Sequence, residues 1–388
     1  MIIDDIARNA AELASWRRDI HAHPELGYQE ERTSRLVAER LEAFGCEVHR
    51  GLGKTGVVGR LSRGTSGRTV GLRADMDALP ITEANSFPHR SQHQGRMHAC
   101  GHDGHTTMLL GAARHLAAHG VFDGTVNFIF QPAEEGGAGA DAMIKDGLFE
   151  RFPCDAVFGM HNMPGLAVGA FSTRPGPTMA GVAIFEILIE GLGGHGAMPE
   201  SAIDPVVVAS QITLALQTIV SRNIRPFDPA VLSVTRIEAG EADNVIPPRA
   251  RLRGTARAFT EATMSLIGER MARLADNIAA GFGATAKIDF RVTYPPLINH
   301  PEETRFAADV AAALVGEANV RRDGVQLMAG EDFSFMLNAR PGAFIYIGNG
   351  EGEGSCEVHN PHYDFNDAVL PLGASLWTRL VETRLVKG

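Results

Sequence analysis

Cysteine is scarce in this sequence, with four among 388 residues, at positions 46, 100, 154 and 356. Small secreted domains that rely on disulfides carry far more for their length, so we expect reduced thiols and a cytoplasmic protein. The first residues lack the basic start and apolar core of a signal peptide. No apolar run approaches the roughly 20 residues that span a bilayer, so we expect no membrane partner.

Positive charge is also in short supply. Lys and Arg number 36 against 46 Asp and Glu, which gives a formal net charge of −10. A nucleic-acid-binding protein needs a basic surface to neutralise phosphates, so no nucleic-acid partner is expected. The hydrophobic content of 44% is that of a folded protein, and the length suits two or three domains.

Residues 1–177 alternate between helical and strand patterns. Two runs, 125–130 and 155–160, are apolar without alternation, as in strands that are buried on both faces of a sheet. This order predicts an α/β domain with a largely parallel sheet. We expect helices over residues 4–21, 30–44 and 106–119, and strands over 56–61, 69–75, 125–130 and 155–160.

Residues 178–292 follow the order β-α-β-β-α-β, which is the ferredoxin-like pattern. Asp204 before Pro205 predicts a helix start, because Asp caps and Pro suits the first helical position. Over residues 264–278 the apolar positions step by 3, 4, 3 and 4, which predicts an amphipathic helix. We therefore expect a small α+β domain inserted into the larger one, which resumes over 293–388.

Cys100 and His102 flank a glycine in the most histidine-rich part of the chain, where five of the 15 histidines lie between residues 89 and 105. Thiolate and imidazole are good ligands for zinc and its first-row neighbours. A single Cys-x-His pair is weak evidence for a metal site, and a buried cysteine with a histidine at a helix start is the alternative.

Glu134 and Glu135 follow the expected strand 125–130 and precede two glycines. Sites in open α/β sheets gather at the carboxyl ends of strands. Adjacent carboxylates can divide the work there, one binding a cation and the other acting as a general base. A solvated acidic turn is the usual alternative for such a pair, and the preceding strand argues against it.

Three further strand ends or loops carry residues of the same kinds. Asp75 ends the run 69–75 and Asp77 follows it, His161 directly follows the run 155–160, and His359 lies near the C-terminus. Parallel strands bring such side chains to one edge, so they can form one site. The joint interpretation is a metal-dependent hydrolase.

His195 lies in a glycine-rich segment of the expected insert. Glycines on both sides leave its imidazole accessible, so it could stabilise an oxyanion. Taken alone, the motif favours the alternative, a glycine-rich hairpin with an incidental exposed histidine. Asn244 and Arg257 carry little information by themselves.

Nine motifs occur in order along nearly the whole chain, at residues 21–27, 73–80, 97–105, 131–135, 161–162, 193–195, 244–247, 330–333 and 359–361. With them the sequence resembles the metal-dependent aminoacylase and carboxypeptidase superfamily. Within it, the chain is similar to the branch of hippurate hydrolases and indole-3-acetyl-amino-acid hydrolases. The resemblance implies a di-metal peptidase-like catalytic domain with an inserted lid and dimerisation domain, and hence a homodimer or higher homo-oligomer.

The resemblance also implies two divalent metal ions per subunit, with zinc, manganese, cobalt and nickel all admissible for mixed ligands. It assigns Glu134 as the general base and Asp77 as the acid that orients a ligand histidine. Asp75 stands where relatives carry a metal-binding histidine and is not counted as a ligand. The implied metal ligands are Cys100, His102, Glu135, His161 and His359.

In the insert, the resemblance implies that His195 contacts the tetrahedral intermediate, within its own chain or across a dimer interface. Asn244 and Arg257 would hold the substrate's carboxylate, Arg257 through a bidentate pair. Relatives often carry tryptophan after the His-Asn motif, where this chain has Met163, and this residue bears on the choice of acyl group.

The function expected is hydrolysis of a small-molecule N-acyl-L-amino acid, such as an N-acetyl or N-benzoyl derivative, to a carboxylate and a free amino acid. A dipeptidase or carboxypeptidase using the same site is one alternative. A metal- or ligand-binding protein without catalysis is another, and it is disfavoured because binding alone does not need both Glu134 and Glu135.

Overall fold

The computed structural model describes residues 1–351 and 356–387, called the described residues below. The chain divides into two compact units. Unit 1 comprises Met1–Gly176, Ile298–Val325 and Asp332–Gly388, and unit 2 comprises Pro177–Leu297 and Gln326–Glu331. The insert expected at 178–292 lies within unit 2, which also takes in residues 177, 293–297 and 326–331 from the parts of the chain assigned to the catalytic domain.

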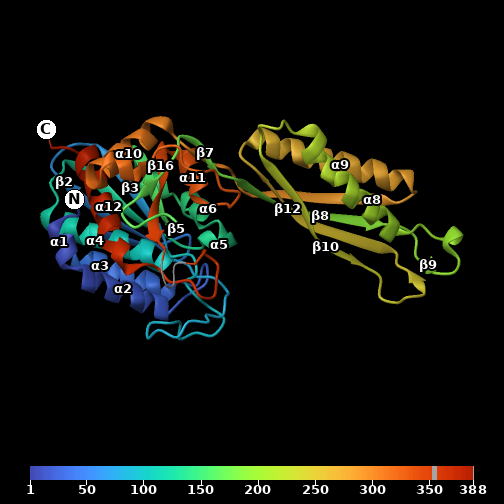
Figure 1. Cartoon of the computed structure of the whole chain (residues 1–388), viewed down its shortest axis with the longest axis horizontal. Coiled ribbons are helices and arrows are strands. Elements are labelled where there is room, and N and C mark those ends of the chain that lie inside the picture. The colour runs from blue at the N-terminus through green and yellow to red at the C-terminus, as the bar shows by residue number, and fades with distance from the viewer. Residues whose placement is uncertain (352–355, 388) are drawn as a thin grey trace. The chain divides into compact units, whose positions relative to one another are not determined.

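Unit 1 is built on an eight-stranded sheet with the order β1-β2-β4-β3-β5-β16-β6-β15 (Figure 1). Its central strands β4, β3, β5 and β16 are mutually parallel, whereas β1, β2 and β6 run antiparallel to neighbours. The largely parallel sheet is therefore confirmed. The strands are β1 Glu47–Leu52, β2 Gly56–Arg63, β3 Thr69–Asp75, β4 Gly124–Gln131, β5 Ala156–Pro164, β6 Phe171–Ser172, β15 Val320–Arg321 and β16 Gly342–Gly350.

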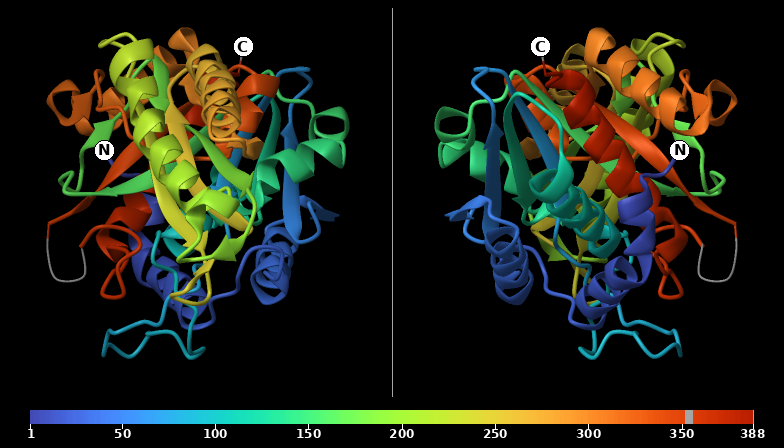
Figure 2. Two further views of the ribbon diagram at one scale, coloured as in Figure 1. Left: turned by 90° about the vertical axis from the view of Figure 1, so that its right-hand side faces the viewer. Right: turned by 90° about the vertical axis from the view of Figure 1, so that its left-hand side faces the viewer.

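Helices α4 and α12 run next to each other across one face of this sheet (Figure 2). The single helix expected over 4–21 is broken at Asn9 into α1 and α2, and α4 starts four residues earlier than expected. The helices of unit 1 are α1 Asp4–Arg8, α2 Ala10–Ala22, α3 Glu31–Ala43, α4 His102–His119, α5 Glu134–Gly137, α6 Gly139–Lys145, α7 Leu148–Arg151, α10 Pro301–Val315, α11 Phe333–Ala339 and α12 Leu370–Arg384, with short turns η3 Glu317–Asn319 and η4 Asp367–Val369.

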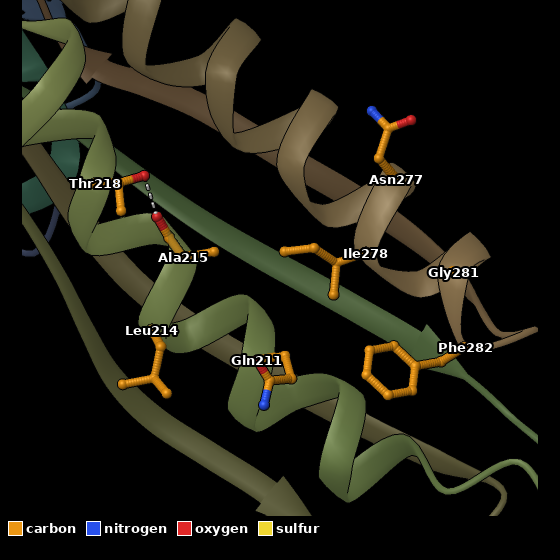
Figure 3. Close-up of a pocket in the computed structure, with 8 residues that line it drawn as sticks. All are labelled: Gln211, Leu214, Ala215, Thr218, Asn277, Ile278, Gly281 and Phe282. Carbon is orange, nitrogen blue, oxygen red and sulfur yellow. Dashed lines mark hydrogen bonds between the residues drawn. The ribbon is translucent and has the colours of Figure 1, made fainter.

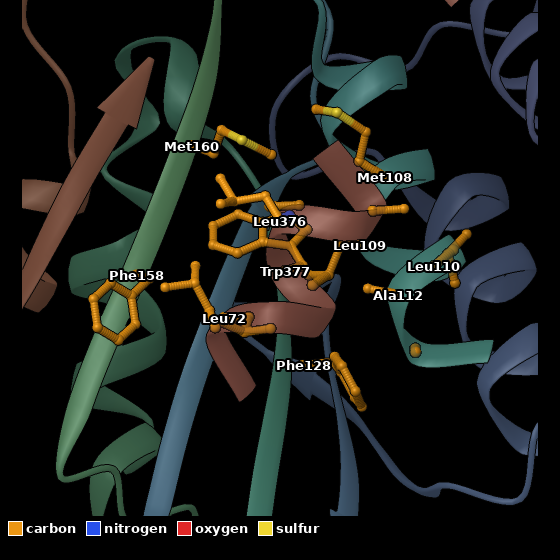
Figure 4. Packing of buried hydrophobic residues seen from close by; sticks show 14 of the residues in the cluster. Leu72, Met108, Leu109, Leu110, Ala112, Phe128, Phe158, Met160, Leu376 and Trp377 are labelled. Carbon is orange, nitrogen blue, oxygen red and sulfur yellow. The ribbon is translucent and has the colours of Figure 1, made fainter. Parts of the chain in front are cut away.

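The core of unit 1 lies between the sheet and these two helices (Figure 4). Leu72 of β3, Phe128 of β4 and Phe158 of β5 face Leu109 of α4 and Trp377 of α12, and all five side chains are buried. Every residue of β4 is buried, which explains why its sequence is apolar without alternation. This packing fixes the strands whose carboxyl ends carry the site.

Unit 2 has a four-stranded antiparallel sheet with the order β10-β12-β8-β13, and α8 and α9 pack on it (Figure 1). Read along the chain, this is the ferredoxin-like arrangement that the sequence predicts. Asp204 and Thr260 cap the two helices with their side chains. The main elements are β8 Gly181–Glu190, α8 Pro205–Thr218, its continuation η2 Ile219–Asn223, β10 Ala230–Ala239, β12 Arg249–Ala258, α9 Glu261–Gly281 and β13 Thr285–Tyr294.

Shorter elements complete the chain, namely β7 Gly176–Met179, β9 Gly194–His195, η1 Pro199–Ser201, β11 Val245–Ile246 and β14 Leu297–Asn299. None of the helices formed by the described residues combines the length and the apolar character needed to cross a membrane.

Candidate functional site

The site in unit 1 lies at the carboxyl edge of its parallel strands. Asp77 follows the end of β3, Glu134 and Glu135 follow the end of β4, and His161 lies within β5. The sequence pattern predicts that this strand ends at residue 160. In the structure β5 continues to Pro164, and His161 is therefore a strand residue rather than a loop residue. Convergence of strand ends is where ligands bind in open α/β sheets.

Gly101 lets the chain turn directly from Cys100 into helix α4. Its φ of +94° is in the left-handed region, which side chains rarely adopt. A Cβ atom at this position would also overlap the side-chain oxygen of Asn162. Glycine is therefore required between Cys100 and His102, and it allows both side chains to reach the same site.

The predicted ligands form two overlapping clusters, and within each cluster the ligand atoms lie within 4.8 Å of one another. Cys100 belongs to both clusters, and its Sγ is 3.3 Å from Nε2 of His161. Oε1 of Glu135 is 3.2 Å from Nε2 of His359. The structure thus brings together all five predicted ligands, as Cys100 with His102 and His161, and Cys100 with Glu135 and His359.

His102 and His161 are oriented as metal ligands are. Nδ1 of His102 is 3.2 Å from Oδ1 of Asp77, while its buried Nε2 has no hydrogen-bond partner among the described residues. Nδ1 of His161 is 2.7 Å from the carbonyl oxygen of Asn162, which leaves Nε2 to face Cys100. A histidine that ligates a metal anchors its second nitrogen in this way, so the residues present fit a cation.

Electrostatics in this cluster also favour a cation. Burial raises the pKa of the Cys100 thiol well above its usual range, and the Glu135 and Glu134 carboxylates add to the effect. Burial disfavours the charged form of His102, but Asp75 and Asp77 raise its pKa to about 10. A bound divalent cation would supply the positive charge that these groups lack and would hold the thiol as thiolate.

Asp75 lies beside the cluster but is engaged by other groups. Its carboxylate is 2.7 Å from Nη1 of Arg73 and 2.6 Å from Nδ1 of His105, and lies 3.8 Å from Nε2 of His102. Asp75, His102 and His105 form a further group with metal-type donors. Sequence reasoning gave no role to His105, although its position one turn after His102 places it on the same side of α4.

Glu134, the predicted general base, is buried next to the predicted ligands. Its carboxylate lies in one group with His102 and Glu135. The backbone N–H of Asp332 donates to Oε1 of Glu134 over 3.4 Å. An acceptor carboxylate beside the ligand atoms has the position that a general base requires.

His195 and Asn244 lie together in unit 2. His195, on β9, is exposed and opposes Val245 on β11, and Gly196 N–H donates to the carbonyl oxygen of Asn244 over 2.8 Å. Arg257 lies elsewhere in this unit, because β12 pairs it with Val182 at the start of β8, whereas β9 follows the end of β8. The structure therefore does not group Arg257 with the other two.

Unit 2 also has an open groove between α8 and α9 (Figure 3). Leu214 of α8 and Ile278 of α9 line it, together with Phe282 just beyond α9. The eight described residues around the groove include no acid, base or thiol, so it lacks the groups that hydrolysis needs.

A parallel α/β sheet whose carboxyl edge gathers thiol, imidazole and carboxylate donors is the architecture of a metal-dependent hydrolase. The chain belongs to peptidase family M20/M25/M40, whose family model matches residues 71–383.

Relatives cover almost the whole chain. A hippurate hydrolase of Campylobacter jejuni is 44% identical over 379 residues, which is 98% of each chain. The IAA-amino acid hydrolase ILR1-like 4 of Arabidopsis thaliana is 40% identical over 96% of this chain and 85% of its own. The crystal structure of a Bacillus subtilis protein, described as a dinuclear metal binding peptidase, is 36% identical with a TM-score of 0.85 and covers 98% of this chain and 99% of its own. The family resemblance of the sequence is confirmed.

Proposed function

We propose that this protein is a metal-dependent amidohydrolase that cleaves N-acyl-L-amino acids to a carboxylate and a free amino acid. One observation carries the proposal: five metal-type donors, among them the unpartnered Nε2 of His102, form two clusters that share Cys100, and the Glu134 carboxylate is grouped with His102 and Glu135. The relatives named as hydrolases of acylated amino acids support this substrate class.

Two divalent ions suit the donors, since Cys100 is common to two three-residue clusters. Cys100, His102 and His161 would hold one ion, and Cys100, Glu135 and His359 the other. When bound, such ions polarise an amide carbonyl and make water a better nucleophile. Zinc, manganese, cobalt and nickel all suit this mixture of sulfur, nitrogen and oxygen ligands.

The chain's own residues then handle the protons. Glu134 accepts a proton from the attacking water and delivers it to the departing amine. Asp77 anchors Nδ1 of His102 so that Nε2 keeps a lone pair for a metal ion. In unit 2, His195 is assigned to the oxyanion, and Asn244 and Arg257 to the substrate's carboxylate.

We further propose that the protein forms a homodimer or higher homo-oligomer and is located in the cytoplasm. The four cysteines form no disulfide among the described residues, in keeping with a reducing compartment.

The test is release of free amino acid from a panel of N-acetyl and N-benzoyl amino acids and dipeptides. Purified protein is stripped with a chelator and reloaded with zinc, manganese, cobalt or nickel. Chelator-sensitive release from acyl amino acids supports the proposal. Release from dipeptides alone would assign a peptidase, and no release by metal-loaded protein would contradict hydrolysis of either class.

Glu134→Gln is expected to keep both metal ions and to lower kcat by about 10²- to 10⁴-fold, the scale of general acid–base catalysis. Metal content after gel filtration and steady-state rates measure the two effects. Parental turnover in this variant would refute the assignment of the general base.

A further inference from the structure

The segment that carries Glu134 and Glu135 has a strained backbone. Ala133 and Ala138 have φ values of +51° and +53°, in the left-handed region that residues with a Cβ atom rarely adopt. Such conformations cost free energy and persist only where the surroundings impose them. We call residues 132–140 the carboxylate loop, and its shape requires an external cause.

One cause is Glu30, which lies at the N-terminus of α3 and is completely buried. Its Oε1 accepts the backbone N–H of Ala133 over 2.8 Å, directly before Glu134. Its Oε2 accepts the hydroxyl of Thr55 over 2.6 Å, which fixes the carboxylate in place. Glu30 therefore holds the residue at which the loop enters its left-handed turn.

Asp332 holds the other end of the same loop. Its Oδ2 accepts the backbone N–H of Ala140 over 2.9 Å, near the start of α6. The residue before that helix is Ala138, whose side chain has no acceptor, so Asp332 supplies the cap from a distant part of the chain. Gln131 and Arg73 donate to the Asp332 carboxylate over 2.8 Å and 3.1 Å and fix it in turn.

Between these ends, Asp77 of the predicted site accepts the backbone N–H of Glu135 over 2.9 Å. Glu30 and Asp332 belong to neither of the two ligand clusters, although Asp332 forms a further group of metal-type donors with Glu134 and Glu331. Their hydrogen bonds fix the backbone on both sides of the general base. A shift of the order of 1 Å in a catalytic group can lower a rate by roughly 10²-fold.

We propose that Glu30 and Asp332 are positioning residues, which hold the carboxylate loop in its strained conformation so that Glu134 and Glu135 face the reaction. The inference rests on the function proposed above. Glu30 acts as an acceptor of two hydrogen bonds, so its shape and acceptor atom matter more than its charge.

The decisive comparison is Glu30→Met against Glu30→Gln in the metal-loaded, full-length enzyme. Glutamine can still accept from Ala133, and the Thr55 hydroxyl can turn to accept from the new amide, whereas methionine can do neither. Glu30→Met is expected to lower kcat by about 10- to 100-fold, with KM within about three-fold of the parent. Glu30→Gln is expected to restore kcat to within about three-fold of the parent.

A second measurement does not depend on turnover. Hydrogen exchange of a peptide spanning residues 132–140 is expected to be at least about ten-fold faster in Glu30→Met, and to be unchanged in Glu30→Gln. Asp332→Asn tests the other end, since an amide cannot accept from all of the donors that surround this carboxylate. It is expected to accelerate exchange in the same peptide and to lower kcat, even if Glu30→Met does not fold.

The matched control is Glu303→Gln, which disturbs another buried carboxylate of unit 1, paired with Arg384 over 3.0 Å. It is expected to change neither kcat nor exchange in the loop. Unchanged kcat and exchange in Glu30→Met, or equal damage in Glu30→Gln, would overturn the positioning role. If the parent hydrolyses nothing on the panel, the proposed function fails, and the exchange data alone decide whether these carboxylates hold the loop.

Discussion

Asp77 makes two hydrogen bonds, and a single substitution can disturb them without changing the size of the side chain. Its Oδ1 lies 3.2 Å from Nδ1 of His102, and its Oδ2 accepts the backbone N–H of Glu135 over 2.9 Å. Asp77→Asn keeps the size of the side chain but replaces one acceptor oxygen by an NH₂ group. Because both neighbours are donors, one of them must then face another donor.

The magnitude follows from the charge on Asp77. A hydrogen bond to a charged group contributes roughly 1.5–3 kcal/mol, and its loss at a buried position is not compensated by water. Since about 1.4 kcal/mol corresponds to a factor of ten, metal affinity is expected to fall by about 10- to 100-fold. Both consequences of the substitution act in this direction, because His102 and Glu135 are both predicted ligands.

The assay is competition between the metal-free protein and a chromogenic chelator for zinc at fixed pH. Asp5→Asn is the matched control, because Asp5 is 3.0 Å from Nδ1 of His115 in a carboxylate–histidine pair outside the site. The control is expected to bind zinc as the parent does. An Asp77→Asn affinity within three-fold of the parent would refute the reasoning, since it would show that the orientation of His102 does not depend on this carboxylate.

Three further predictions concern stability and local geometry. Burial disfavours charge on His21, but its hydrogen bond with Asp103 contributes to raising its pKa from an ordinary 6.5 to about 9. The stability that the charged His21 contributes is therefore full below pH 6.5 and is lost as the pH rises through 9. The difference in free energy of unfolding between the parent and His21→Gln, measured with urea, should shrink over that interval. Trp377→Ala should lower the free energy of unfolding by about 3–5 kcal/mol in the same assay, because this side chain fills the core. Gly101→Ala should weaken zinc binding in the chelator competition, since the added Cβ would displace Asn162. A zinc affinity equal to that of the parent would show that glycine is not required at this turn.

Much of the fold can be predicted from local patterns. The strand expected at residues 69–75 is β3 with the same bounds, and the apolar runs of β4 and β5 are strands that are buried in the sheet. In unit 2, the 3-4 spacing of apolar residues predicts α9, since one face of that helix packs on the sheet. Hydrophobic burial is periodic in these elements, so it leaves a pattern in the sequence.

The start of α4 illustrates what such patterns miss. Its first four residues, 102–105, include two histidines and an aspartate, and polar residues of this kind usually indicate a loop. All four are buried, and the three polar side chains pair with other polar groups, for example His102 with Asp77 and Asp103 with His21. A helix end that is buried through polar contacts has no hydrophobic period, so the sequence placed its start at residue 106.

The candidate ligands could be named from the sequence because their residue types and their places after strands both have chemical meaning. The groups that hold them could not. Glu30 and Asp332 lie 103 and 192 residues from the backbone N–H groups that they accept, and no local spacing encodes such contacts. Arg257 shows the converse. The resemblance that assigned it to the substrate's carboxylate did not reveal that it pairs with the start of β8, whereas β9 with His195 follows the end of that strand.

The order of strands in unit 1 has a consequence for synthesis on the ribosome. Strand β5 pairs with β3 on one side and with β16 on the other, and β16 comes after unit 2 in the chain. At a translation rate of about 5–20 residues per second, the free edge of β5 stays open for roughly 10–40 s before β16 emerges. During that time an apolar strand edge is available to other nascent chains, so the half-made polypeptide is prone to aggregate. Chaperones that bind the nascent chain before β16 emerges would therefore be an advantage for this topology.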